Sequence, residues 1–97
     1  GIPHTTWRRR RIEEGDVVVL ETSACYNRYH VALFRTAMIG KVPQLARDMY
    51  AVCAKGLEAA LSKLRVGNTC ADVHNAVQAV IDEAGFTAGY RKRTGYS

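Results

Sequence analysis

Long hydrophobic runs, prolines and paired cysteines are scarce in this sequence, and each shortage excludes a class of protein. No apolar run approaches the roughly 18 residues of a membrane-spanning helix. The three cysteines, Cys25, Cys53 and Cys70, form no C-x-x-C pair for zinc or redox chemistry, and their odd number argues against a disulfide framework. We therefore expect three reduced thiols, packed as small hydrophobic residues.

The remaining composition is that of an ordinary globular domain. With 97 residues, two prolines, 47% hydrophobic and 24% charged residues, the chain is neither disordered nor of low complexity. A domain of this length buries only about 60–65% of the surface that its unfolded chain exposes, so its core is modest. The first residues show no charged-then-apolar leader, and we expect a cytoplasmic protein.

The net charge of +5 raises the question of nucleic-acid binding, and its distribution answers it. The arginine run at 8–11 is followed at once by three acidic residues, Glu13, Glu14 and Asp16. Basic residues do not alternate with aromatic ones as they do in strips that stack on bases. Residues 90–97 carry +3 of this charge and no acidic residue, whereas residues 1–16 and 17–89 carry +1 each. We expect a solvated, partly neutralised loop at 8–11 and no nucleic-acid partner.

Two strands are predicted in the first 40 residues. Gly15 and Asp16 form a turn, and the apolar run at 17–20 after it is typical of a short buried strand that ends at Glu21. A second strand is predicted over 29–39, closed by Gly40. Alternation places His30, Ala32 and Phe34 on one side of that strand and Val31, Leu33 and Arg35 on the other.

Two amphipathic helices are predicted after the strands. Pro43 suits the first turn of the first helix, and Gly67 ends it. Thr69, with Asp72 three residues later, is typical of a capping box, and Gly85 is the expected stop of the second helix. Both helices carry apolar stripes that predict packing faces. The stripes are formed by Leu45, Met49, Val52, Cys53, Gly56, Leu57, Ala60, Leu61 and Leu64, and by Val73, Ala76, Val77, Val80, Ile81 and Ala84.

The order strand, strand, helix, helix defines an α+β unit. A set of motifs in fixed order accompanies these elements: residues 15–21 (GDVVVLE), 26–30 (YNRYH), 35–36 (RT) with Gly40, 65–73 (RVGNTCADV) and 84–86 (AGF). In this order and spacing the chain resembles the pita-bread enzymes, a family that includes creatinase, prolidase, Xaa-Pro aminopeptidase and methionine aminopeptidase. The resemblance implies that residues 1–97 are a partial catalytic domain with no second domain within the chain. The expected fold is the first half of a pita-bread domain, a short antiparallel sheet covered by two helices.

The resemblance also identifies three positions at which the family's peptidases hold metal. Those peptidases bind two divalent metals through two Asp, one His and two Glu, and the metals activate a bridging water. Three of the five positions fall within this chain, at Glu21, Ala32 and Tyr96. Alanine has no donor atom, and a tyrosine hydroxyl is a poor substitute for imidazole. We predict no metal cofactor; manganese or cobalt is expected only if the chain is a peptidase of this family.

The sequences of residues 28–30 (RYH) and 93–97 (RTGYS) most resemble those of a metal-free branch of the family that includes the ectoine hydrolases. The predicted function is metal-independent hydrolysis of a C–N bond in a small amidine, guanidino or amide compound. One alternative is a metallopeptidase of the Xaa-Pro dipeptidase or aminopeptidase type. A third is a catalytically silent binding module, for which the basic residues 91–93 are the support.

His4 and Glu21 are the predicted catalytic residues. In the family a histidine ahead of the first strand points into the active site, and imidazole can take a proton from water and return it to a leaving nitrogen. The other interpretation of His4 is an exposed loop residue. Glu21 can pair with a planar cation, act as a base or attack as a nucleophile. Its structural alternative is a carboxylate satisfied by backbone amides or by Arg35.

Four further residues, Tyr29, His30, Arg93 and Tyr96, are predicted to bind substrate. Each has a structural alternative, as a core, contact or rim residue. His74, by contrast, is expected at the surface or boundary of its helix, and Trp7 and Tyr50 are expected to be packing residues. The resemblance implies a small-molecule substrate, a homodimer for the full-length protein and no membrane partner, and the 97 residues alone are expected to be inactive.

Overall fold

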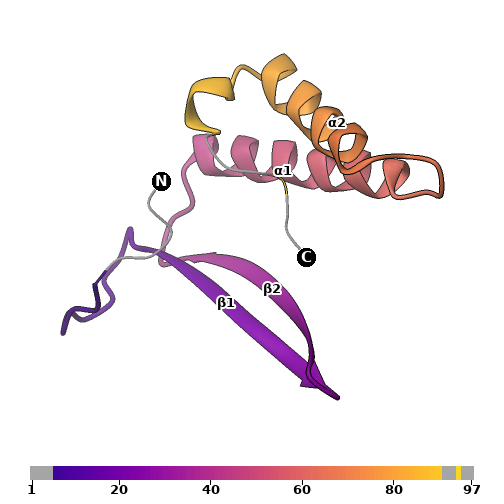
Figure 1. Cartoon of the computed structure of the whole chain (residues 1–97). Coiled ribbons are helices and arrows are strands. Elements are labelled where there is room, and N and C mark those ends of the chain that lie inside the picture. The colour runs from indigo at the N-terminus through magenta and orange to yellow at the C-terminus, as the bar shows by residue number, and fades with distance from the viewer. Residues whose placement is uncertain (1–5, 91–93, 95–97) are drawn as a thin grey trace. The chain divides into compact units, whose positions relative to one another are not determined.

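The computed structural model describes residues 6–90 and Thr94. His4, Arg93 and Tyr96, three of the predicted site residues, lie outside this part of the chain. The described elements follow the predicted order of two strands and two helices, with a short 3-10 helix, Thr87–Gly89, at the end (Figure 1). They belong to two compact units, a hairpin unit over residues 6–43 and a helix unit from Gln44 on.

The hairpin unit consists of β1 (Val17–Tyr26) and β2 (Tyr29–Met38), paired antiparallel along their whole length. The turn between them has only two residues, Asn27 (φ 47°) and Arg28 (φ 69°). Two consecutive positive φ angles define a type I′ turn, whose twist matches that of the flanking strands. β1 is longer than the predicted 17–20, because pairing with β2 continues the strand through polar residues that have no apolar pattern of their own.

The predicted turn at Gly15 and Asp16 closes the base of the hairpin. The Gly15 N–H donates to the Ile39 carbonyl oxygen at 2.8 Å, and the Ile39 N–H donates to the Asp16 carbonyl oxygen at 3.0 Å. Gly40 follows with φ 81°, and a Cβ atom placed there would collide with the side chain of Glu14. The positive φ therefore favours glycine at position 40, whereas the exposed Glu14 side chain could move away from a Cβ atom.

Residues that pair directly share a face of the sheet, so the register divides the hairpin into two faces. The Glu21 face consists of Val17, Val19, Glu21, Ser23, Cys25, His30, Ala32, Phe34, Thr36 and Met38. The Leu20 face consists of Val18, Leu20, Thr22, Ala24, Tyr26, Tyr29, Val31, Leu33, Arg35 and Ala37. The predicted alternation along the second strand is confirmed. The two faces differ in chemistry, because the Glu21 face carries a carboxylate, two hydroxyls, a thiol and an imidazole.

The helix unit is built from α1 (Gln44–Lys63) and α2 (Cys70–Glu83), which pack against each other (Figure 1). The predicted capping box at the start of α2 is confirmed. The Asp72 N–H donates to Thr69 Oγ1 at 3.2 Å, and the Thr69 N–H donates to Asp72 Oδ2 at 2.7 Å. These reciprocal bonds satisfy two backbone donors at the helix start. The Thr69 N–H, followed by the Thr69 hydroxyl, also holds the pKa of the Asp72 carboxyl below its ordinary value.

The end of α2 is a Schellman motif centred on Gly85, which confirms the predicted glycine stop. Gly85 has φ 78°. Its N–H donates to the Asp82 carbonyl oxygen at 3.0 Å, and the Phe86 N–H donates to the Ile81 carbonyl oxygen at 3.0 Å. Phe86 also packs against the small core that contains Ile81, which is the hydrophobic contact typical of this motif.

The core of the helix unit is narrower than the predicted stripes. Its buried hydrophobic residues are Ala60, Val77 and Ile81, each 7% exposed. Gly56 is also buried, and a Cβ atom there would lie 3.4 Å from Val77 Cγ1, so the two helices approach closely at this point. In the rest of the predicted first stripe, Val52 is half-buried against this core. The other members are exposed, namely Leu45, Met49, Cys53, Leu57, Leu61 and Leu64. A pair of helices buries only the sides that face each other, which explains the difference.

The expectation that the cysteines are packed is wrong. All three thiols, Cys25, Cys53 and Cys70, are free and exposed. The expected packing of Trp7 and Tyr50 is also wrong, since they are 76% and 75% exposed. Two strands and two helices have too few layers to enclose these side chains. Within the described residues, neither helix combines the length and the apolar character needed to cross a membrane.

Candidate functional site

Glu21 and Ala32, two of the positions that the resemblance assigns to metal ligands, lie together on the Glu21 face. Glu21 pairs directly with Phe34, and Ala32 pairs directly with Ser23. Glu21 and Ala32 are therefore diagonal neighbours across the two strands, a relationship that separates such residues by about 7–8 Å. The eleven-residue spacing between them brings them together only because a two-residue turn sets the register.

The remaining described candidates are divided between the two faces. His30 lies on the Glu21 face, one pleat beyond Ala32, and pairs directly with Cys25. Tyr29 lies on the Leu20 face, opposite Tyr26, so the hairpin does not bring it together with Glu21. Both tyrosines are strongly exposed. The roles predicted for His4, Arg93 and Tyr96 concern residues outside the described part of the chain.

Arg35, the structural partner considered for Glu21, lies on the opposite face of the hairpin. It pairs directly with Leu20, and its Nη1 atom donates to the Phe34 carbonyl oxygen at 2.7 Å. The position of Arg35 follows from alternation, because it is an odd number of residues from Ala32 and Phe34. The hairpin geometry therefore gives no support to a structural Glu21–Arg35 pair.

The donor set at these positions does not fit the two-metal centre of the family's peptidases. Ala32 supplies no ligand, and its direct partner Ser23 carries a neutral hydroxyl whose contact with the Ala24 carbonyl oxygen is long, at 3.4 Å. Hard divalent cations bind preferentially through several oxygen ligands, carboxylates above all. Among the described residues, no three His, Cys, Asp or Glu side chains gather into a possible metal site.

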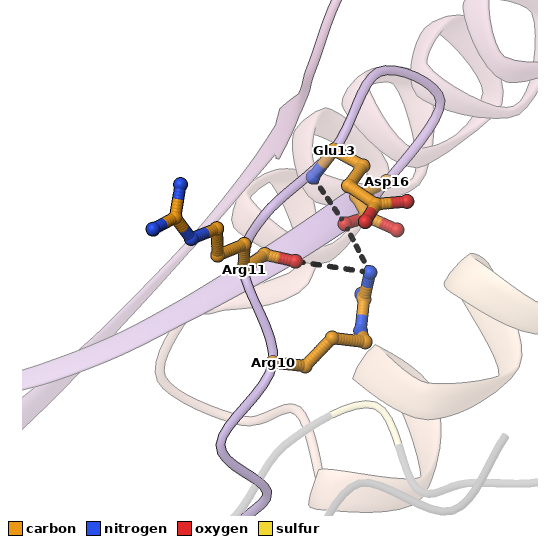
Figure 2. A network of polar contacts seen from close by, with 4 residues as sticks. All are labelled: Arg10, Arg11, Glu13 and Asp16. Atoms are coloured by element: carbon orange, nitrogen blue, oxygen red, sulfur yellow. Dashed lines mark hydrogen bonds and ion pairs between the residues drawn. The ribbon is translucent and has the colours of Figure 1, made fainter.

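The arginine run before β1 has a structural contact (Figure 2). Arg10 Nη1 donates to Asp16 Oδ2 at 2.8 Å and to the Arg11 carbonyl oxygen at 3.2 Å, and the Glu13 N–H donates to the same Asp16 oxygen at 2.8 Å. The hydrogen bond from Arg10 lowers the pKa of the Asp16 carboxyl, and the Glu13 N–H acts in the same direction. The expected partial neutralisation of the run is confirmed, with Arg10 holding the turn that precedes the sheet.

A hydroxyl network in the helix unit is a contact that sequence patterns do not predict. Thr94 Oγ1 lies 2.7 Å from His74 Nδ1 and 3.1 Å from the Tyr90 hydroxyl. A threonine hydroxyl has one proton to donate, so a Thr94 that donates to a neutral imidazole can accept from Tyr90. All three residues are half-buried, which agrees with the boundary position expected for His74. The network connects α2 to Thr94.

The chain belongs to metallopeptidase family M24, whose sequence pattern it matches over residues 1–97. The predicted relationship to the pita-bread hydrolases is therefore confirmed. An ectoine hydrolase from Halomonas elongata is 33% identical over 94 residues, covering 97% of this chain and 23% of that protein. A Xaa-Pro dipeptidase from Pyrococcus furiosus is 28% identical over 85 residues, covering 88% of this chain and 24% of that protein.

Solved structures agree with the predicted fold. A prolidase from Thermococcus sibiricus superimposes with a TM-score of 0.86 and 26% identity, over 96% of this chain and 25% of that one. The prolidase from Pyrococcus furiosus gives a TM-score of 0.79 with 28% identity, over 90% of this chain and 26% of that one. The chain thus spans about a quarter of the length of these relatives, and its elements are those of a partial pita-bread domain.

Proposed function

We propose that the protein carrying this chain hydrolyses a C–N bond in a small amidine, guanidino or amide compound without a metal at the Glu21 and Ala32 positions. The observation that carries the proposal is Ala32. It occupies the position diagonal to Glu21 where the family resemblance places a metal-binding carboxylate, and its methyl group has no lone pair. The similarity to a protein named ectoine hydrolase supports an amidine, because ectoine is a cyclic amidine.

In this proposal the carboxylate of Glu21 anchors the substrate. An amidinium group presents two parallel N–H donors, which match the two oxygens of a carboxylate. Pairing with Glu21 would hold the planar carbon of the amidine against the Glu21 face. A carboxylate in that position can also attack the carbon directly as a nucleophile.

His4 supplies proton transfer in the water-dependent route. It takes a proton from a water molecule as the water oxygen forms a bond to the amidine carbon. The C–N bond then breaks, the same proton is delivered to the departing nitrogen, and the proton of the new hydroxyl group is released as the C=O bond forms. The products are an amide and an amine, which for a cyclic amidine remain parts of one opened molecule.

A metallopeptidase of the Xaa-Pro type is the second candidate, favoured by the family match and by the prolidase structures. It requires the metal to be held by residues other than Ala32, with manganese or cobalt as the expected ion. A catalytic role for the metal would then replace the roles given above to His4 and Glu21.

The test is made on the protein expressed from its full coding sequence. The bound metal is measured after dialysis without chelator, and turnover of ectoine and of a Xaa-Pro dipeptide is measured with and without added manganese. Near-zero metal with chelator-resistant hydrolysis of ectoine is the expected result. About two metals per chain with manganese-dependent peptide cleavage would overturn the proposal in favour of the peptidase.

Two variants test the roles of the residues. His4→Ala is expected to lower kcat by about 10²–10⁴-fold, the usual contribution of a proton-transfer group. Glu21→Gln is expected chiefly to raise KM, because it removes the charge that pairs with the amidinium. Glu58→Gln, the same change at an exposed residue of α1, is the matched control and is expected to keep wild-type activity. Wild-type kcat in His4→Ala would eliminate the proton-transfer role.

A further inference from the structure

Phe34 is the direct cross-strand partner of Glu21. Directly paired residues of antiparallel strands have Cβ atoms about 4.5–5.5 Å apart, and their side chains stand roughly perpendicular to the sheet. The carboxyl carbon of a glutamate and the ring centre of a phenylalanine lie at comparable distances from Cβ. The carboxylate and the ring therefore rise side by side from the same face, and Phe34 is 49% exposed.

The positions around this pair are occupied by small, uncharged side chains. Ala32 and Thr36 flank Phe34 along β2, and Val19 and Ser23 flank Glu21 along β1. The Ala32–Ser23 pair is the smaller of the two neighbouring pairs and leaves the most room beside Glu21 and Phe34. A ligand that approaches the carboxylate from this side meets the ring without meeting a second charge from these four neighbours.

We propose that Phe34 is a specificity-determining residue that selects a planar cation, an amidinium or guanidinium, over a neutral amide. The proposal rests on the substrate-binding role of Glu21 proposed above, and narrows the substrate to the charged members of that class. A cation within about 6 Å of a ring centroid is attracted by the negative face of the ring. A planar cation that is paired with the Glu21 carboxylate can come within that distance of the Phe34 ring and stack on it.

A neutral amide gains much less from the same arrangement. It offers N–H donors to the carboxylate, but it lacks the positive charge that the ring attracts. Removal of the ring is therefore expected to weaken binding of the cation by about 5–30-fold and to leave binding of the neutral ligand within about twofold. A purely structural role for Phe34 would weaken both ligands by the same factor.

The experiment measures binding of acetamidinium and of acetamide to the protein expressed from its full coding sequence, by NMR titration. Phe34→Leu removes the ring, and Phe34→Tyr keeps it as the conservative rescue. Tyr26→Leu removes an aromatic ring from the opposite face of the same hairpin and is the matched control. Circular dichroism of each variant serves as the control that the fold is retained.

Selective loss of acetamidinium affinity in Phe34→Leu, its recovery in Phe34→Tyr and no change in Tyr26→Leu are the expected results. Equal losses for both ligands, or no loss in Phe34→Leu, would overturn the proposal, as would a wild-type protein that does not bind acetamidinium. Ectoine turnover separates the two proposals. Ring-dependent cation binding without hydrolysis contradicts the proposed function alone, whereas hydrolysis that Phe34→Leu leaves unchanged contradicts the role of Phe34 alone.

Discussion

Replacement of Gly56 by alanine tests the close approach of the two helices. Gly56 lies inside α1, is buried, and faces Val77 of α2. An alanine in the interior of a helix is favoured over glycine by about 0.8–1.0 kcal/mol. The new methyl group would lie 3.4 Å from Val77 Cγ1, at the lower limit of an ordinary contact. We therefore expect Gly56→Ala to raise the free energy of unfolding by about 0.5–1 kcal/mol, most of the propensity gain.

Leucine at the same position has the opposite effect. The leucine side chain has three more carbon atoms than that of alanine, and they have no space between α1 and Val77. Such overpacking costs about 1–3 kcal/mol. Gly67→Ala is the matched control for the glycine-to-alanine change. Gly67 has φ 97°, and no atom lies within 4 Å of the place that a methyl group would take. The loss in Gly67→Ala therefore reflects backbone strain alone and is expected to be about 1 kcal/mol.

Urea unfolding followed by circular dichroism measures all three variants against the wild-type protein. From most to least stable, the expected order is Gly56→Ala, wild type and Gly67→Ala. Gly56→Leu is also expected to be less stable than the wild type. A Gly56→Ala protein that is destabilised by about 1 kcal/mol or more would refute the reasoning, because the propensity gain would then be outweighed by a Val77 side chain that cannot yield. An unchanged Gly56→Leu protein would refute the close approach itself.

Three other predictions concern the hairpin turn, a helix cap and the candidate site. Arg28→Gly should stabilise the hairpin by about 0.5–1 kcal/mol in the same urea assay, because glycine adopts φ 69° without strain, and a loss of stability would contradict the type I′ turn. Asp72 has a lowered pKa because of the Thr69 N–H, so its stabilisation is present above about pH 4 and is lost as the pH falls through its folded-state pKa. Asp72→Asn should thus lower stability at about pH 7 and approach the wild type only as the pH falls below the folded-state pKa; a difference that stays the same through that fall would contradict the sign. Ala32→Asp should create saturable manganese binding in calorimetry by adding a carboxylate diagonal to Glu21, while Ala32→Asn should not, and equal binding by both variants would contradict the diagonal placement.

Local signals predicted the helix ends because the interactions involved are local. The capping box needs only Thr69 and Asp72, three residues apart, and both of its bonds are present. The glycine stop at Gly85 needs only a positive φ and the bonds of the last turn. The unexpected length of β1 has the converse explanation. Residues beyond Leu20 are polar or small, so they extend only because a second strand pairs with them.

The candidate site was predictable in part. Alternation correctly placed His30, Ala32 and Phe34 on one side of β2, since side chains in a strand have a period of two. The position of Glu21 relative to them depends on register, and register depends on the number of residues in the turn. Asn27 is a frequent residue in two-residue turns, but Arg28 at a positive φ is an uncommon successor, so the turn type was not evident.

The sequence by itself determined the order of strands and helices, where α2 begins and ends, and which family the chain resembles, because these follow from periodicity, capping and motif order. Tertiary structure alone decided that Phe34 faces Glu21, that Thr94 joins His74 to Tyr90, and that the apolar stripe of α1 is only partly buried. These are relations between residues distant in the chain. They depend on strand register and on the distance between helices, and no local pattern specifies either of them.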